Sequence, residues 1–458
     1  MMQELRILSP TAILGYGFPM ESFTEGMKRK PHVIAVDAGS TDPGPYYLGA
    51  GESFTDFNSV KRDLEIMIPA ALEAGIPVII GTAGGCGGYP HVAFNLEIIQ
   101  QIAAAKKLSF KLAVIQSELD KELIKEKLAG GDIEPLFPAK QITAEDVDNC
   151  VRIVAQIGED PFIKALEGGA NVILAGRAYD PSVFAALAIK EGFNKGLAIH
   201  LGKILECAAI AAIPGSGSDC MMGYLHQDDF VLEPLSPLRK CTTLSVAAHT
   251  LYEKTNPYML PGPGGAINLH NTQFTQLTEN TVKVTGSTFV PTEEYFVKLE
   301  GVKKVGYRTI SIAGVKDPVM IEKIDEVVQS VKERVQNNFE SYGIKDFFLD
   351  FKIYGKNGVM GFFPGIDQRI GHELALVIEA VAPTQEQADT ICGFARSTML
   401  HFGYEGRIST AGNLAFPFSP SDCKVGEVYE FSIYHLMRVA DPSEYFPITY
   451  MQFTNGSH

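Results

Sequence analysis

The chain lacks several features that would place it in a specialised class of protein. Its seven cysteines are an odd number without tight spacing in 458 residues, so we expect reduced thiols in a cytoplasm rather than disulfides or a zinc site. The first residues, MMQELRILSP, show no charged region followed by a long apolar run, and we expect no signal peptide. The most apolar window, 196–214, contains Lys203 and Glu206 and is too short and too charged to span a bilayer.

Positive charge is also scarce. The chain has 39 Lys and Arg against 54 Asp and Glu, a formal net charge of -15. This balance argues against nucleic acid and anionic membranes as partners, although a single arginine can still hold an anionic small-molecule substrate. Apolar residues, in contrast, make up 46% of the chain and charged residues 20%, which is typical of a globular protein with a large core.

Residues 1–213 predict a parallel α/β domain. Short apolar runs at 5–8, 33–36, 78–80, 112–115 and 171–175 alternate with segments of helical spacing. This alternation predicts a doubly wound, Rossmann-like sheet. A capping-box pattern at Thr143–Asp146 predicts a helix that breaks near Asp160. Residues 214–302, which contain the PGPGG turn at 261–265, are expected to form an irregular cap or insertion.

Residues 303–458 show a different pattern. Extended runs at 306–312, 347–354, 374–380 and 428–434 and helices that start at Asp317 and Thr384 give the order β-α-β-β-α-β. This order predicts a C-terminal α+β domain of ferredoxin-like type. The tail from Arg438 contains turn residues and no clear element.

The candidate site follows from residues expected at the carboxyl ends of strands, where open parallel sheets bind ligands. Four predicted strands are followed at that edge by segments of polar or glycine residues, at 37–42, 81–88, 116–118 and 176–180. Among the carboxylates there, Asp37 and Asp42 are candidate ligands of an oxygen-preferring metal such as Mg²⁺. Their spacing does not require a metal, so the sequence indicates no certain cofactor.

The glycine-rich run 81–88 follows a strand and precedes a helix. Backbone N–H groups at such a place can bind an anion, with help from the helix N-terminus. The run lacks the Gly-Lys-Ser/Thr ending of a P-loop and is no G-x-G-x-x-G, and its alternative interpretation is a tight turn. Cys86 is either a nucleophile or, as we prefer, a buried inert thiol. The predicted substrate contacts are Thr82, Gly84, Gly85, Cys86 and Gly87.

Arg177 and Asp180 come after the last predicted strand of this domain. A guanidinium is suited to clamp a substrate carboxylate, and the alternative for Arg177 is a structural ion pair. Asp180 precedes a proline, which is typical of a helix N-terminus, so helix capping is the alternative to a catalytic role.

His200, Lys203 and Glu206 lie at i, i+3 and i+6 of an apolar helical segment, where uncompensated charge is costly. Lys203 and Glu206 can pair, and such a pair in a dry site can carry general acid/base catalysis. The alternative is a polar surface on an otherwise buried helix. Further along, Ser245, His249 and Glu253 are one turn apart, but a straight helix seldom aims a triad at one point, so hydrolysis is disfavoured.

Several runs together resemble the acyclic terpene utilisation family AtuA. They are DAGSTDPGPYYLG (37–49), GRAYDPSVFAA (176–186), HLGKILECAA (200–209), CTTLSVAAHTLYE (241–253), VKLEGVKKVGYRTISIAGVKDP (297–318) and AFPFSPSD (415–422). The resemblance implies catabolism of a hydroxy acid or acyl thioester, with a small companion protein as a separate chain. The positions carried over are Asp37, Thr41, Asp42, Arg177, Asp180, His200, Lys203, Glu206, His249 and Arg308.

The resulting hypothesis is a hydro-lyase, a dehydratase or hydratase, acting on a small hydroxy carboxylic acid or its CoA thioester. Lys203 or His200 would take the proton α to the carboxylate, and Asp180 or Glu206 would help the hydroxide leave. Arg177 would hold the substrate with Thr41, Asp37, the glycine-rich run, His249 and Arg308. The alternatives are an isomerase or racemase of the same substrates and a non-catalytic subunit whose companion performs the chemistry. We expect a homo-oligomer.

Overall fold

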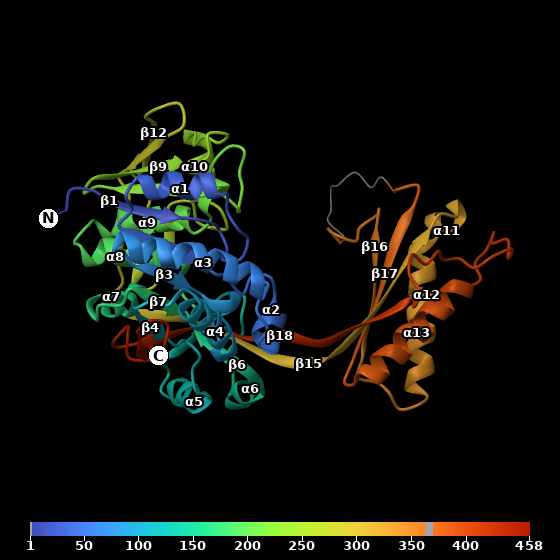
Figure 1. The fold of residues 1–458 in the computed structure, drawn as a ribbon. Coiled ribbons are helices and arrows are strands. Elements are labelled where there is room, and N and C mark those ends of the chain that lie inside the picture. The colour runs from blue at the N-terminus through green and yellow to red at the C-terminus, as the bar shows by residue number, and fades with distance from the viewer. Residues whose placement is uncertain (1, 362–369) are drawn as a thin grey trace. The chain divides into compact units, whose positions relative to one another are not determined.

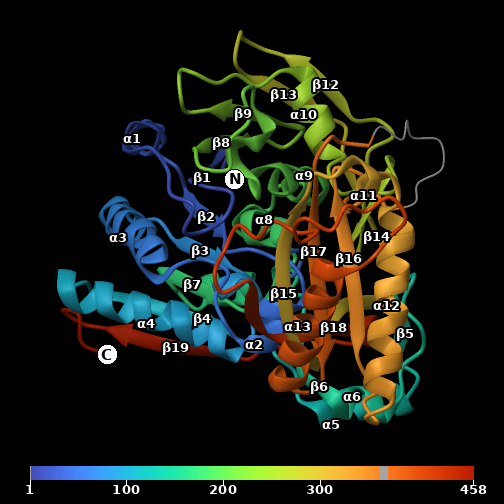
Figure 2. The same ribbon diagram turned by 90° about the vertical axis from the view of Figure 1, so that its right-hand side faces the viewer.

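The computed structural model describes residues 2–361 and 370–458. The chain divides into two compact units, a larger one of Met1–Lys303 and Phe431–His458 and a smaller one of Lys304–Glu430. Figures 1 and 2 show the ribbon of each unit from two directions. The two units are described one after the other.

A ten-stranded sheet forms the centre of the larger unit, in the order β12-β13-β9-β8-β1-β2-β3-β7-β4-β19. The five strands β1, β2, β3, β7 and β4 pair in parallel, and the strands on either side of them pair antiparallel. The strand bounds, in spatial order, are Gln273–Gln276, Val282–Thr285, Asp229–Pro234, Met221–Leu225, Leu5–Ser9, Val33–Asp37, Val78–Gly81, Val172–Ala175, Phe110–Ile115 and Ile448–Phe453.

Helices cover both faces of this sheet (Figure 1). Successive residues of a strand point to opposite faces, and in β2 Val33 and Ala35 belong to one apolar core while Ile34 and Val36 belong to the other. Strands buried on both faces read as continuous apolar runs, which is why the segments near 33–36 and 78–80 could be recognised. The prediction of an α/β unit with parallel strands is confirmed.

The helices on one face are α1 (Met20–Lys28), α3 (Phe57–Ala74) and α4 (Tyr89–Lys106), and those on the other are α7 (Glu159–Glu167), α8 (Asp180–Lys190) and α9 (Lys195–Leu205). Helix α3 begins at a cap in which Asp56 accepts hydrogen bonds from the next amides, and it ends at Gly75 in the left-handed conformation. The remaining helices of this unit are α2 (Pro45–Ala50), α5 (Lys121–Ala129), α6 (Ala144–Asn149), α10 (Thr243–Thr250) and the 3₁₀ turns Ala83–Gly85 and Ala208–Ala211.

Residues 214–302 supply the sheet strands β8, β9, β12 and β13 and a separate antiparallel sheet. That small sheet consists of β10 (Met259–Gly262), β11 (Gly265–Asn268) and β14 (Thr288–Pro291). It packs against α9 so closely that a Cβ on Gly196 would lie 2.4 Å from the backbone of Thr288. Helix α9, which carries His200 and Lys203, therefore lies between the central sheet and this small sheet.

Two sequence expectations are wrong in this unit. The helix that starts after Thr143 ends at Asn149, and strand β6 (Cys150–Ala155) follows, because 150–155 pairs with 299–303 of β15 (Tyr295–Val315). The tail after Arg438 is not without structure. Strand β19 pairs with the whole of β4, and the ring of Phe453 stacks on that of Phe110 at 4.8 Å. A short strand β5 (Ile133–Pro135) pairs with β18 (Asp422–Val439).

The smaller unit has the element order β-α-α-β-β-α-β, which differs from the predicted β-α-β-β-α-β in that two helices, α11 and α12, stand where one was expected. Its strands lie in the order β16-β17-β15-β18, with antiparallel pairing of β16 to β17 and of β17 to β15. The bounds of its other elements are α11 (Pro318–Glu322), α12 (Ile324–Glu340), β16 (Phe348–Tyr354), β17 (Leu374–Ala382) and α13 (Gln385–His401). Apolar residues of α12, α13 and one sheet face form its core.

All seven cysteines are free thiols. Among the residues that the structure describes, no helix is both long enough and apolar enough to cross a membrane.

Candidate functional site

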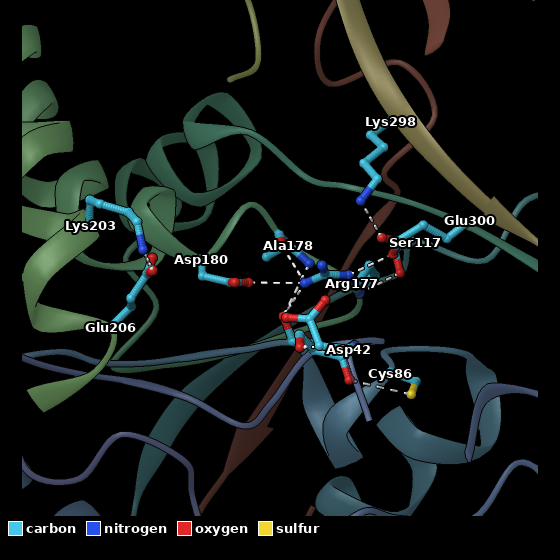
Figure 3. A network of polar contacts seen from close by, with 12 residues as sticks. Asp42, Cys86, Ser117, Arg177, Ala178, Asp180, Lys203, Glu206, Lys298 and Glu300 are labelled. Atoms are coloured by element: carbon cyan, nitrogen blue, oxygen red, sulfur yellow. Dashed lines mark hydrogen bonds and ion pairs between the residues drawn. The ribbon is translucent and has the colours of Figure 1, made fainter. Parts of the chain in front are cut away.

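A charged network lies where the parallel strands of the larger unit end. Strand β2 ends at Asp37 opposite Gly81 of β3, and β4 and β7 end side by side at Ile115 and Ala175. Because the strands are parallel, the segments that follow them share one edge of the sheet. Figure 3 shows the polar contacts that these segments make with one another.

Arg177 is the centre of this network, and its side chain is only 4% exposed. Its Nε donates to Glu300 at 2.8 Å, and its Nη1 donates to Asp180 at 2.9 Å and to the Ala178 carbonyl at 2.8 Å. Burial by itself would lower the pKa of Arg177, but Glu300 and Asp180 raise it well above the ordinary value. The guanidinium is therefore a permanent buried cation with two carboxylate partners.

Glu300 of β15 is the second buried partner, with 1% of its side chain exposed. It lies between two cations, since Lys298 Nζ is 2.8 Å from its second carboxylate oxygen (Figure 3). Burial opposes ionisation, but Arg177 and Lys298 lower the pKa of Glu300 to about 2. Glu300 is thus a carboxylate at any physiological pH, and it fixes the orientation of Arg177.

Two hydroxyl groups join the strand ends. Ser117 accepts a hydrogen bond from the Arg177 amide at 2.6 Å and donates to the Gly87 carbonyl at 2.9 Å. The Thr82 hydroxyl accepts from the Ala178 amide at 3.3 Å and from Arg177 Nη1 at 3.4 Å. Thr82 has a left-handed φ of 48°. That conformation is uncommon for a threonine, and such strain persists only where the surroundings hold it.

Besides Glu300, the carboxyl groups of Asp37, Asp180 and Glu206 interact with cations of the network. Burial raises the pKa of Asp37, and the charge of Asp180 raises it further. Burial also raises the pKa of Asp180, although Arg177 opposes this. One oxygen of Asp37 and one of Glu206 are buried and accept no hydrogen bond from any described residue. Such groups favour the protonated form or a donor supplied by a ligand.

Lys203 and Glu206 form an ion pair at the end of α9, with Nζ 2.6 Å from Oε1 (Figure 3). The Lys203 side chain is 3% exposed. Burial would lower the pKa of Lys203, but Glu206 raises it above the ordinary value. Burial raises the pKa of Glu206 to about 7, with Lys203 opposing and Asp180 adding to the shift. Glu206 is therefore a carboxyl group that changes protonation state near neutral pH.

His200 is fully buried on α9, and both of its ring nitrogens are engaged. Nδ1 is 2.7 Å from the Ser287 hydroxyl and Nε2 is 2.9 Å from the Thr250 hydroxyl. Burial and the charge of Lys203 lower its pKa to about 3. This histidine is a neutral link between α9, α10 and the strand segment near 287, and it has no free nitrogen for a substrate.

His249 is buried on α10, with its ring stacked on Tyr252 at 5.4 Å. Its Nε2 is buried and has no hydrogen-bond partner among the described residues. Burial and Lys203 lower its pKa to about 4. The ring of Tyr252 in turn lies 5.6 Å from Lys203 Nζ. The end of α10 therefore adjoins the Lys203–Glu206 pair.

The glycine-rich run is packed rather than open. A Cβ on Gly87 would lie 1.9 Å from the Arg177 amide nitrogen, and one on Gly85 would lie 2.6 Å from Phe54. The amides of Gly85 and Gly87 donate to carbonyls inside the run. The first amide of α4, that of Tyr89, donates to the carboxylate of Glu118 at 2.7 Å.

The amides of Gly85, Gly87 and Tyr89 are thus already used by the protein itself. Gly84 has φ 61° and packs on His91 in the same way. Burial raises the pKa of Cys86 to about 12, so its thiol stays protonated. These contacts account for the run by packing, which is the alternative interpretation of the sequence.

The remaining predicted residues are less directly connected. Thr41 is buried and Asp42 is exposed in the loop after β2, and the charge of Asp42 contributes to the raised pKa of Asp180. Arg308 lies in the smaller unit, where its Nε is 2.5 Å from Glu379. Within 2–361 and 370–458, no three His, Cys, Asp or Glu side chains are grouped to hold a metal ion.

Sequence reasoning missed Glu300, Lys298 and Lys254. Glu300 stands in the alternating run of β15, and a single charge on a buried strand is the only local signal for it. Lys254 lies after the turn 251–253 that follows α10, and its amine interacts electrostatically with Lys203, Glu206 and Asp180. A lysine beside a turn resembles any solvated surface lysine, so the sequence carries no signal for it.

The parallel sheet and the buried cluster of carboxyl groups and cations at its carboxyl edge define an α/β protein with a buried charged network where its parallel strands end (Figure 3). A family model, described as acyclic terpene utilisation family protein AtuA, matches residues 55–214 and 239–414. The chain therefore belongs to the AtuA family of acyclic terpene utilisation, as the resemblance of its motifs predicted. No curated protein and no solved structure matches the chain.

Proposed function

We propose that this AtuA-family chain is a catabolic hydro-lyase that removes water from, or adds it to, a small hydroxy carboxylic acid or its CoA thioester. The observation that carries the proposal is Glu206, a buried carboxyl group with a pKa of about 7 beside the ammonium group of Lys203. A carboxyl group poised near neutral pH can deliver a proton to a departing hydroxide and recover it in the reverse direction.

Lys203 acts as a fixed cation in this proposal. Despite burial, Glu206 raises the pKa of Lys203 above its ordinary value, and the Oε1 atom that accepts the hydrogen bond from Lys203 can keep that bond when Oε2 carries the proton, so Lys203 does not accept a proton. Its role is to stabilise the enolate oxyanion that forms when the proton α to the carbonyl leaves, because a preorganised charge in a dry site is far more effective than one in water. The unpaired Oε2 of Glu206 is the oxygen that faces the substrate hydroxyl.

Arg177 holds the substrate carboxylate or thioester carbonyl by its outer nitrogen. Nε and Nη1 are used by protein acceptors, whereas no described residue accepts a hydrogen bond from Nη2. The contact is therefore a single charge-assisted hydrogen bond and not a bidentate clamp. His200 has no role in proton transfer, because both of its nitrogens are engaged.

The test is a turnover assay of the purified chain with a panel of small hydroxy acids and their CoA thioesters, read by the absorbance of the conjugated product. Glu206→Gln should lower kcat by about 10²–10⁴-fold, the usual contribution of a general acid. Glu191→Gln is the control, since its carboxylate pairs with Lys190 at the end of the neighbouring helix α8. Full activity of Glu206→Gln would refute the assignment.

Two other outcomes would replace the proposal. Exchange of the α hydrogen with deuterated solvent, without loss of water, would indicate an isomerase or racemase. Turnover that needs a second, separately produced protein and survives both Glu206→Gln and Lys203→Met would indicate a non-catalytic subunit. A thermal-shift screen finds binders even without turnover, because a ligand of the native state raises the Tm.

A further inference from the structure

The proposed reaction needs a group that accepts the proton α to the carbonyl, and the four residues predicted as catalytic from the sequence, Lys203, His200, Glu206 and Asp180, do not supply it. Lys203 is held as an ammonium group by Glu206, and His200 has no free nitrogen. Asp180 is tied to Arg177. The acceptor must therefore come from another element that reaches the Lys203–Glu206 pair.

The turn after α10 is such an element. The Thr250 hydroxyl hydrogen-bonds to His200 Nε2 at 2.9 Å, which fixes the end of α10 to α9. Tyr252, two residues on, lies with its ring 5.6 Å from Lys203 Nζ. The backbone then folds back, because Glu253 takes a left-handed φ of 60° and the Lys254 amide donates to the Leu251 carbonyl at 3.1 Å. A strained non-glycine residue at this point is typical of a turn that presents a functional side chain.

Lys254 differs from Lys203 in one decisive respect. Its ammonium group makes no ion pair or hydrogen bond to any residue in the described part of the chain, whereas Lys203 has a carboxylate at 2.6 Å. The charged groups that face it are Lys203 and Glu206 of α9, Asp180 of α8 and Glu253 of its own turn. Burial and the positive charge of Lys203 lower the pKa of the Lys254 amine, with the three carboxyl groups opposing.

We propose that Lys254 is a catalytic residue, the base that takes the α proton of the substrate. This inference rests on the proposed hydro-lyase function. The neutral amine of Lys254 binds the proton, and the electrons of the C–H bond form the enolate. The enolate then forms the carbon–carbon double bond as the C–O bond breaks, and the proton of Glu206 joins the leaving hydroxide as water. Lys254 afterwards loses its proton to solvent and Glu206 regains one.

The first experiment needs no substrate, so its failure can be told apart from failure of the hydro-lyase proposal. Trace acetylation with acetic anhydride over a range of pH, followed by peptide mass spectrometry, gives a titration midpoint for each lysine. We expect the midpoint of Lys254 to lie below that of the exposed Lys240 and that of Lys203 to lie above it. Each unit of midpoint corresponds to about tenfold more free amine at a given pH.

Two variants test the electrostatic connection. Lys203→Met removes the neighbouring positive charge and should raise the Lys254 midpoint, and Glu206→Gln removes a negative charge and should lower it. Lys190→Met, on the outer end of α8, is the control and should leave it unchanged. A Lys254 midpoint at or above that of Lys240, or one that neither variant moves, overturns the proposal.

The second experiment uses the substrate found by the turnover assay. Lys254→Met and Lys254→Arg should both abolish turnover, since neither offers a neutral amine, while the substrate-induced rise in Tm persists. The acid limb of the pH profile of kcat/KM should coincide with the Lys254 midpoint from acetylation. Retained turnover in Lys254→Met overturns the proposal while leaving the hydro-lyase function in place.

Discussion

Replacement of Glu300 by glutamine tests the network around Arg177 most directly. The carboxylate is buried between Arg177 and Lys298, each with a nitrogen 2.8 Å from one of its oxygens. Its pKa falls from the ordinary 4.5 to about 2 despite burial, because both cations favour the ionised form. A difference of this size corresponds to about 3 kcal/mol of native-state stability at neutral pH, since each pKa unit is worth about 1.4 kcal/mol.

Glu300→Gln should therefore lower the free energy of unfolding by about 3 kcal/mol, within the range expected when one partner of a buried ion pair is removed. Urea unfolding followed by far-ultraviolet circular dichroism is the appropriate assay, because the chain contains no tryptophan. The control is Glu122→Gln, whose carboxylate is 81% exposed and pairs with Lys125 at the surface. That change should cost less than about 1 kcal/mol.

The sign of the pH dependence gives a second check. A carboxyl group with a lowered pKa stabilises the fold above its unfolded pKa of about 4.5, and this contribution disappears as the pH falls toward about 2. The difference between wild type and Glu300→Gln should shrink over the same interval. In the double variant with Arg177→Met, the loss should be smaller than the sum of the single losses. An equal loss in Glu300→Gln and Glu122→Gln would refute the reasoning.

Three further predictions concern the same unit. Burial raises the pKa of Glu206 to about 7, so the native state keeps a proton that the unfolded chain releases above about pH 4.5. The free energy of unfolding should therefore fall as the pH rises from about 4.5 to about 7. In urea titrations, Glu206→Gln should remove this pH dependence. Gly87 and Gly131 have similar positive φ angles, 71° and 76°, but an alanine Cβ at Gly87 would lie 1.9 Å from a backbone nitrogen, whereas one at Gly131 meets open space. In urea unfolding, Gly131→Ala should lower the free energy of unfolding by about 1–2 kcal/mol. Gly87→Ala should lower it by clearly more. Iodoacetamide on the native protein should alkylate the exposed Cys423 and spare Cys86, whose buried thiol has a pKa of about 12, as peptide mass spectrometry can measure.

The parts of the fold that the sequence predicts are those with strong local patterns. The buried strand Val33–Asp37 is a continuous apolar run, and helix Ile324–Glu340 repeats apolar residues on one face. Strands β6 and β19 were missed because their formation depends on distant partners. Residues 150–155 pair with 299–303, and Ile448–Phe453 pairs with β4 more than 300 residues earlier. A short edge strand has no periodicity long enough to identify it.

In the candidate site, too, local contacts could be predicted from the sequence and contacts between distant residues could not. The pairs Arg177–Asp180 and Lys203–Glu206 are three residues apart, so their contact could be anticipated from helical spacing. The partner that fixes Arg177 most firmly, Glu300, is 123 residues away and could not be. The glycine-rich run has the composition of an anion site, but Glu118 already occupies the first amide of α4, and only coordinates reveal such an internal ligand.

The balance of charge in the site bears on what it can bind. Its carboxyl groups are those of Asp37, Asp180, Glu206 and Glu300, and its basic groups are those of Arg177, Lys203, Lys254 and Lys298. Glu300 is ionised, whereas burial raises the pKa values of the other three carboxyl groups, because a bound proton costs less there than an unpaired carboxylate. In the proposed reaction an anionic substrate would bring another negative charge, which would raise the pKa of Glu206 further. The same negative charge would raise the pKa of the proposed base Lys254, whereas burial and the positive charge of Lys203 lower it.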